Sequence, residues 1–321
     1  DVSIPASIGD LTSLRELWTN NNDLTGAIPS SIGDLSNLTL LSLSVNNLTG
    51  SLPSSIGNLS SLNALRLDNN ELSGTLPGEI GNLAALTFLD VTNNDFTGQI
   101  PSSIGNLTAL VSLRMSSNAF EGVIPDEFGD LVNLADISLA FNDLTGSIPP
   151  SMGNLVDLTL LLLNDNDLEG VVPSSLANLT KLTKLYLNNN QLTGSPGFIS
   201  ALVDLKEIVI HDNGFSGDFP PVGQLSDLEY LWAFNNAFTS IPADILDLDN
   251  LVNVLFNNNA LGAIPDFSQH QNKANLQVHL SNNRLLFSSL EGLFTGAGQH
   301  GFASLVYSTQ KPIDEVPEMA V

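Results

Sequence analysis

Residues 35–58 read LSNLTLLSLSVNNLTGSLPSSIGN, and the chain then repeats the same arrangement of leucine, asparagine, glycine and proline in LSSLNALRLDNNELSGTLPGEIGN at residues 59–82. Most copies of this unit begin 24 residues apart, and the later ones 23. They start at Leu11, Leu35, Leu59, Leu83, Leu107, Leu131, Leu155, Leu179, Leu202, Leu225 and Leu248, with a degraded copy around Asn272. One unit of this length cannot bury its apolar side alone, so the repeat predicts stacked coils with a shared core rather than two globular domains.

The fixed positions of the unit each have a structural reason. Leu41 and Leu43 alternate with serines, which is the period of a short strand with one buried face. Asn46 and its equivalents are expected to bond the backbone of the turn and of the adjacent coil, because a buried amide is costly unless it is satisfied. Gly50 permits the turn after the strand. The run S-S-I-G-[DN] predicts a short 3₁₀ turn on the outer face.

The repeat L-x-x-L-x-x-L-x-L-x-x-N-x-L-x-G-x-I-P resembles that of leucine-rich repeat proteins, over residues 4–285. Its G-x-I-P segment resembles the plant-type subclass, as in receptor-like kinase ectodomains and polygalacturonase-inhibiting proteins. The resemblance implies an α/β solenoid, a right-handed superhelix or horseshoe of about twelve coils, with a parallel sheet on the concave face and short 3₁₀ helices on the convex face.

The two ends of the chain depart from the plant-type pattern. Members of that subclass usually carry a cysteine-containing N-terminal cap, whereas this chain has no cysteine and starts inside a repeat. We therefore expect residues 1–285 to be a solenoid that belongs to a longer protein or has an unusual cap. Residues 286–321 leave the repeat pattern and are expected to form a C-terminal cap and tail.

The composition excludes several classes of function. The chain has 34 Asp and Glu against 9 Lys and Arg, a formal net charge of −25. Such a surface repels phosphate backbones and anionic lipids, so a nucleic-acid or membrane-surface role is not expected. No apolar run is long enough to span a bilayer. The four histidines are scattered and no metal-ligand or phosphate-binding motif occurs, so we expect neither an enzyme nor a required cofactor. A catalytic triad around His211 and Asp212 is the alternative.

The residues between the inward leucines line the exposed face of the predicted sheet and carry the candidate binding site. Aromatic and apolar side chains concentrate in the second half of this face, although only 6% of the chain is aromatic. Tyr and Trp are enriched at binding hot spots. The predicted ligand-binding residues are Phe141, Leu160, Leu162, Tyr186, Val209, His211, Tyr230, Trp232 and Phe234. The alternative is that these side chains pack against each other or against the C-terminal cap.

Two charged sets suggest secondary sites. Opposite charges alternate across neighbouring coils, which predicts either ion pairs along the sheet or a polar ligand site. A second, acidic set predicts either a bound Ca²⁺ or a solvated charged edge, because carboxylates at equivalent positions of adjacent coils repel one another. The polar set is Arg66, Asp68, Asp90 and Arg114, and the acidic set is Asp143, Asp165 and Asp167.

These observations predict a non-enzymatic, monomeric recognition module that binds a protein, peptide or carbohydrate on its sheet face. The resemblance implies an extracellular or cell-surface location, as part of a larger receptor-like or adhesion protein. One alternative is a receptor kinase ectodomain or an inhibitor of wall-degrading enzymes. Another is an ice-binding or structural surface, because exposed asparagines recur at one position of the repeat to form a partial polar array. They are Asn21, Asn69, Asn93, Asn189, Asn235, Asn258 and Asn282, interrupted by Val45, Ser117, Phe141, Asp165 and Asp212.

Overall fold

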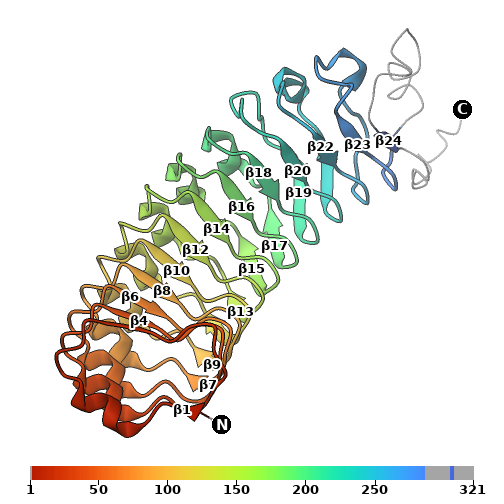
Figure 1. Ribbon diagram of the computed structural model, residues 1–321. Coiled ribbons are helices and arrows are strands. Elements are labelled where there is room, and N and C mark those ends of the chain that lie inside the picture. The colour runs from red at the N-terminus through yellow and green to blue at the C-terminus, as the bar shows by residue number, and fades with distance from the viewer. Residues whose placement is uncertain (1, 286–303, 307–321) are drawn as a thin grey trace, which may run out of the picture. The chain divides into compact units, whose positions relative to one another are not determined.

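The computed structural model describes residues 2–285 and 304–306, and the chain forms two compact units, Asp1–Glu169 and Gly170–Val321. In each unit a typical repeat forms one coil, which contains two short strands and a 3₁₀ helix (Figure 1). All helices of the described residues are 3₁₀ helices, so the helical part of the predicted α/β class consists of these turns. The predicted parallel sheet and the predicted short 3₁₀ helices are confirmed.

The first unit contains two parallel sheets, and the 3₁₀ helices follow the strands of the second sheet along the chain. The first sheet orders its strands as β2 (Glu16–Trp18), β4 (Leu40–Ser42), β6 (Ala64–Arg66), β8 (Phe88–Asp90), β10 (Ser112–Arg114), β12 (Asp136–Ser138) and β14 (Leu160–Leu162). The second has β1 (Val2–Ser3), β3 (Leu24–Gly26), β5 (Asn47–Gly50), β7 (Glu71–Thr75), β9 (Asp95–Gln99), β11 (Ala119–Val123), β13 (Asp143–Gly146) and the start of β15 (Asp167–Val171). The helices are η1 (Ala6–Asp10), η2 (Ser30–Asp34), η3 (Ser54–Asn58), η4 (Gly78–Asn82), η5 (Ser102–Asn106), η6 (Asp126–Asp130) and η7 (Pro150–Asn154).

The second unit continues the same plan. Its first sheet has β16 (Lys184–Tyr186), β18 (Glu207–Val209), β20 (Tyr230–Trp232), β22 (Asn253–Leu255), β23 (Gln277–His279) and β24 (Ser304–Val306). Its second sheet has β17 (Gln191–Gly194), β19 (Gly214–Asp218) and β21 (Ala237–Ser240). The helices are η8 (Ser174–Asn178), η9 (Gly197–Ala201), η10 (Ala243–Asp247) and η11 (Phe267–Gln269). Of the predicted C-terminal cap, residues 286–303 and 307–321 lie outside the described residues, and β24 pairs in parallel with β23.

The second sheet of each unit was not predicted from the sequence. Its strands precede the G-x-I-P segment and end at its glycine position or one residue later. In the first unit they pair with an offset of 22 residues, as Gly74 pairs with Phe96. Within β9, Phe96 is buried while Asp95 and Thr97 are exposed, which is the alternation of a strand with one buried face. In the first sheet of this unit the offset is 24 residues, as for Leu41 and Leu65. In the first sheet equivalent positions of successive repeats therefore lie beside each other. In the second sheet each residue lies beside a residue two positions earlier in the next repeat.

The predicted asparagine ladder is confirmed. Asn46 is 8% exposed, and its Nδ2 donates to the carbonyls of Thr19 and Leu43 at 3.0 and 2.9 Å. Its Oδ1 accepts from the backbone N–H of Leu24 in the preceding coil at 3.0 Å. In the second unit Asn236, which is half-buried, makes the corresponding bonds. Each of these amides thus ties its turn to the coil before it.

One backbone position in every described coil has a left-handed conformation. It follows the first strand by three residues, and φ there lies between 52° and 57°. Asparagine occupies this turn in most coils because it tolerates left-handed φ. Val45 and Phe141 occupy the same position, at 44% and 56% exposure. The asparagines of the predicted polar array therefore lie in turns and not on the strands themselves.

Candidate functional site

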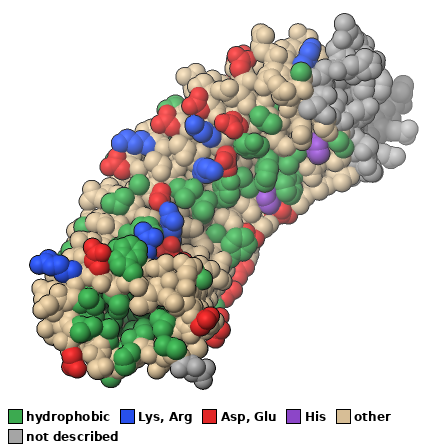
Figure 2. Space-filling view, in the orientation of Figure 1, with side chains coloured by type: hydrophobic (Ala, Val, Ile, Leu, Met, Phe, Trp, Pro, Cys, Tyr) green, Lys and Arg blue, Asp and Glu red, His purple; other side chains and the backbone are tan. Residues whose placement is uncertain are grey.

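The first sheet of the second unit aligns the candidate binding residues in rows. In the parallel register Tyr230 lies between Glu207 and Asn253, and Trp232 lies between Val209 and Leu255. The middle residue of each of these strands is fully buried, so the residues on either side of it share the opposite, outward face. Hydrophobic side chains gather on this face beside a histidine (Figure 2).

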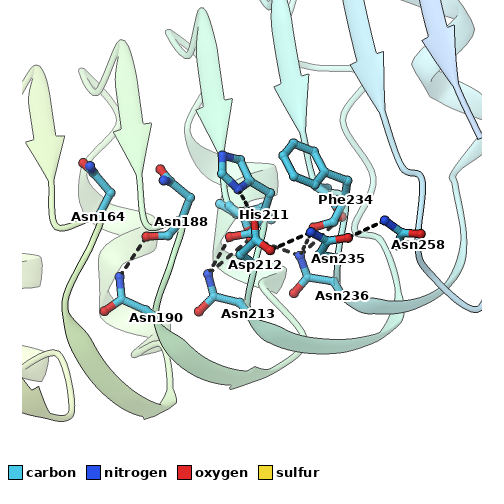
Figure 3. A network of polar contacts seen from close by, with 12 residues as sticks. Asn164, Asn188, Asn190, His211, Asp212, Asn213, Phe234, Asn235, Asn236 and Asn258 are labelled. Atoms are coloured by element: carbon cyan, nitrogen blue, oxygen red, sulfur yellow. Dashed lines mark hydrogen bonds and ion pairs between the residues drawn. The ribbon is translucent and has the colours of Figure 1, made fainter.

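Four side chains on two successive coils form a continuous group, which we call the aromatic cluster: His211, Tyr230, Trp232 and Phe234. The His211 ring stacks on Phe234 with a centroid distance of 4.1 Å and an interplanar angle of 9° (Figure 3). The ring centroid of Trp232 lies 6.5 Å from that of His211 and 6.4 Å from that of Tyr230, which Trp232 meets edge to face. All four side chains are half-buried. The members of this aromatic surface therefore pack against each other, as the alternative interpretation expected.

A chain of polar side chains holds one edge of the aromatic cluster. Asp212 Oδ2 lies 2.6 Å from His211 Nδ1, and Asp212 Oδ1 accepts from Asn235 Nδ2 at 2.6 Å (Figure 3). Asn235 Oδ1 in turn accepts from Asn258, and Asn258 Oδ1 from Asn282, at 2.6 and 2.7 Å. Asp212 thus joins the row of asparagines that it was expected to interrupt. The carboxylate fixes the orientation of the imidazole that Phe234 stacks against.

Tyr186 is anchored separately from the aromatic cluster. Its hydroxyl donates to Glu207, which also forms an ion pair with Lys184 at 2.8 Å. Burial raises the pKa of Glu207, but hydrogen bonds from Lys184 and Tyr186 outweigh it and hold that pKa below its ordinary value. Burial, together with the bond to Glu207, raises the pKa of Tyr186. Tyr186 therefore remains a hydrogen-bond donor, and this group forms a charged border on strands β16 and β18.

Two features of the predicted aromatic site need correction. Val209 is only 4% exposed, because its cross-strand neighbours Tyr186 and Trp232 are much larger and cover it. Phe141 is exposed, but it lies in the left-handed turn after β12 and not on a strand. Leu160 and Leu162 are half-buried on β14. These two leucines and Phe141 belong to the first unit.

The charged set of the first unit is arranged around an aromatic ring. Arg66 and Arg114 flank Phe88, with their guanidinium carbons 4.3 and 5.4 Å from its centroid. Arg66 and Asp90 are cross-strand partners, but Asp90 accepts from the Thr92 N–H instead. Arg114 of this set forms an ion pair with Asp136, which lies outside the set, with 3.4 Å between the Arg114 Nη2 and Asp136 Oδ2 atoms.

The predicted ladder of ion pairs is thus replaced by cation–π stacking on Phe88. Asp68, the fourth member of the set, accepts hydrogen bonds from Ser44 and Asn69. Burial raises the pKa of Asp90, and the hydrogen bonds from Thr92 offset part of that rise.

The structure does not assemble the predicted calcium site. The offset of the second sheet pairs Asp143 with Glu121 and Asp167 with Thr145, so Asp143 and Asp167 are not opposite each other. Asp165 lies in a left-handed turn and accepts from Asn164 Nδ2 at 2.7 Å. No group of three or more His, Cys, Asp or Glu able to hold a metal ion occurs among the described residues. The calcium hypothesis was wrong because it assumed the register of the first sheet.

The His211–Asp212 contact that a catalytic triad would need is present, but its third member is not. No serine or threonine hydroxyl within the described ranges hydrogen-bonds to His211. The ring is held by Asp212 on one side and stacked on Phe234 on the other.

Comparisons with known proteins agree with this architecture. The leucine rich repeat family matches residues 36–96, and a second leucine rich repeat description matches residues 13–35, 109–131, 133–155 and 181–202. No curated protein sequence matches the chain. In the part of the chain that the structure describes, no helix is long and apolar enough to cross a membrane.

Several solved structures are similar to the chain. The plant peptide hormone receptor RGFR1 in complex with RGF2 is 36% identical, with a TM-score of 0.83 over 88% of this chain and 46% of that one. A TDR receptor is 32% identical, with a TM-score of 0.88 over 96% and 53%. A plant ice-binding protein is 28% identical, with a TM-score of 0.63 over 77% and 80%. The chain thus spans about half the length of the two receptors. By its repeat, its coils and these matches, the chain belongs to the leucine-rich repeat proteins, in the plant-type subclass.

Proposed function

We propose that the chain is a non-enzymatic recognition module that binds a peptide on the strand face of its second unit. The observation that carries the proposal is the aromatic cluster, a half-buried group of four rings on the outward face of the first sheet. Such anchors dominate binding energy at interfaces, because they bury large apolar areas at low conformational cost.

The similar receptors support a peptide as the ligand. RGFR1 is in complex with RGF2, and its description is that of a peptide hormone receptor. The chemistry of the face agrees, because Tyr230, Trp232 and Phe234 offer apolar contact while Lys184 and Glu207 border it with fixed charge. A row of short parallel strands also presents successive coils at about 4.8 Å, so an extended segment can contact one coil after another.

The same relatives support a proposal on the location and the larger context. We place the module outside the cell or at its surface, as a monomeric part of a receptor-like or adhesion protein, or of an inhibitor of wall-degrading enzymes. The net charge of −25 favours a ligand with positive charge, since it steers such a partner toward the chain and repels acidic ones.

Selection of binding peptides tests this proposal. The full chain is immobilised, peptides are selected from a random displayed library, and the affinity of the best peptide is measured by calorimetry. Tyr230→Ala and Phe234→Ala are expected to weaken binding at least tenfold, as truncation of hot-spot aromatics does. Trp18→Ala is the matched control, because Trp18 is 57% exposed on a strand of the first unit. Failure to obtain a peptide, or equal affinity of all these variants, would refute the proposal.

Ice binding is a second candidate, favoured by one specific observation. Asn235, Asn258 and Asn282 occupy the same turn position of successive coils, and each donates its side-chain amide to the residue one coil before it. The ice-binding relative shares the repeat fold. Measurement of thermal hysteresis decides between the candidates, since a peptide-binding module is expected to show none. Hysteresis that disappears in Asn235→Leu would establish ice binding.

A further inference from the structure

Two polar atoms on the strand face of the second unit are buried without a hydrogen-bond partner. They are the indole Nε1 of Trp232 and the side-chain Oδ1 of Asn253. The described residues contain two further such side-chain atoms, Thr19 Oγ1 and Ser112 Oγ, both in the first unit. Buried polar groups almost always find a partner, because an unmet one loses its hydration without compensation.

Trp232 and Asn253 are diagonal neighbours on one face of the sheet. The register pairs Tyr230 with Asn253 and Trp232 with Leu255, so Trp232 and Asn253 lie on adjacent strands two residues apart. Residues in this relation are about 7–8 Å apart and within reach of one another's long side chains. The two unmet atoms therefore belong to neighbouring side chains at the edge of the aromatic cluster.

The chemistry of the two atoms is complementary. An indole N–H is a donor only, whereas the free atom of Asn253 is an acceptor. Asn253 Nδ2 already donates to Gln277 Oε1 at 3.2 Å. Turning both amides over would retain that bond and leave the Asn253 nitrogen unmet instead. In either orientation Asn253 keeps one polar atom for an outside partner.

We infer that Trp232 and Asn253 together bind one main-chain amide of the ligand, an inference that rests on the proposed peptide-binding function. Trp232 Nε1 donates to the carbonyl oxygen, and Asn253 Oδ1 accepts from the N–H of the same peptide unit. A peptide unit carries its oxygen and nitrogen about 2.3 Å apart, and with hydrogen bonds of about 2.9 Å at both ends it spans about 8 Å. Diagonal neighbours, whose backbones lie about 7–8 Å apart, can bring two side-chain atoms to that separation.

In the free protein this place is closed. Both atoms are shielded from solvent, and Trp232 lies against Tyr230 and His211 at 6.4 and 6.5 Å. Binding therefore requires the Trp232 side chain to turn outward, after which both polar atoms gain partners. A residue that binds ligand in this way destabilises the free fold, which separates it from a structural residue.

The test combines stability with affinity, on the full chain and the peptide selected above. Asn253→Leu removes the unmet group at similar volume and also loses the bond to Gln277, whose net contribution is smaller than the cost of the unmet group. We therefore expect a higher melting temperature but about tenfold weaker peptide binding. Trp232→Phe is expected to weaken binding to a similar extent. Asn257→Leu is the matched control on the same coil and is expected to change affinity less than twofold. Amide-to-ester replacement along the peptide locates the bonded unit, because an ester lacks the N–H.

One ester position is expected to weaken binding to the wild-type chain and to leave binding to Asn253→Leu unchanged. The inference is overturned if every ester weakens binding to both chains equally, or if Asn253→Leu binds as tightly as wild type. In that case Tyr230→Ala and Phe234→Ala still report on the proposed function separately. If no peptide binds at all, both the inference and the proposed function are overturned.

Discussion

The asparagine ladder gives a prediction whose size follows from its individual hydrogen bonds. Asn94 is 8% exposed, and its Oδ1 accepts from the backbone N–H of Leu72 at 3.0 Å. Its Nδ2 donates to the carbonyls of Leu67 and Val91 at 3.0 and 3.1 Å. Replacing Asn94 with alanine leaves the Leu72 N–H without its partner inside the core.

The two carbonyls keep other donors, and this limits the cost. Leu67 O also accepts from Asn70, and Val91 O also accepts from Asn118, each at 3.0 Å. The orphaned N–H costs about 1–3 kcal/mol, and the two lost bonds add about 0.5–1.5 kcal/mol each in net terms. We therefore expect Asn94→Ala to lower the free energy of unfolding by about 2–6 kcal/mol.

Asn22 is the matched control for this prediction. It occupies the same position in the first coil, is exposed, and donates only to the nearby carbonyls of Thr19 and Asn20. Asn22→Ala should cost no more than about 1 kcal/mol. Urea denaturation of the full chain, followed by circular dichroism, measures both. Equal losses for the two variants would refute the argument that the bond to the preceding coil carries the energy.

Three other substitutions test the local geometry. A Cβ on Gly57 would lie 2.5 Å from Glu79 O, so Gly57→Ala should lower the free energy of unfolding by about 2–3 kcal/mol in thermal or urea unfolding. The control Gly78→Ala should be near neutral, because the nearest atom to its Cβ would lie at 3.9 Å. Equal effects of the two variants would contradict the close approach. Val45→Asn should stabilise by about 1 kcal/mol, because φ is 56° there; a loss would count against backbone strain. Burial raises the pKa of Asp90, so the ionised form of this side chain destabilises the fold. Asp90→Asn should therefore raise the melting temperature at about pH 7 but not near pH 3, where the aspartic acid and the asparagine are both neutral. A difference in melting temperature that stays the same at the two pH values would contradict this.

The repeat alone predicted the first sheet, the 3₁₀ helices and the asparagine ladder, because each depends on residues at fixed positions within one unit. The second sheet was missed because its pairing depends on an offset between units. The alternation of Leu48 with Asn47 and Thr49 was the available signal. The same offset explains why the Asp143–Asp167 hypothesis failed.

The aromatic cluster was predictable in membership but not in depth. Tyr230, Trp232 and Phe234 stand at outward positions of the repeat, and the structure confirms that they share one face. Val209 stands at the same repeat position as Trp232 but is covered by its larger neighbours. The repeat position alone does not show this, because it says nothing about the size of the side chains on the adjacent strands. The link from Asp212 to Asn235 was visible only as a shared turn position, because a side-chain hydrogen bond depends on rotamers.

Hydrogen–deuterium exchange of the full chain, with and without a selected peptide, tests the central claim most directly. The account predicts that the peptide slows exchange in strands β18, β20 and β22 and leaves the strands of the second sheet unchanged. Backbone amides around Tyr230 and Trp232 should be the most protected. Protection confined to the second sheet, or to the first unit, would contradict the account and place the ligand elsewhere.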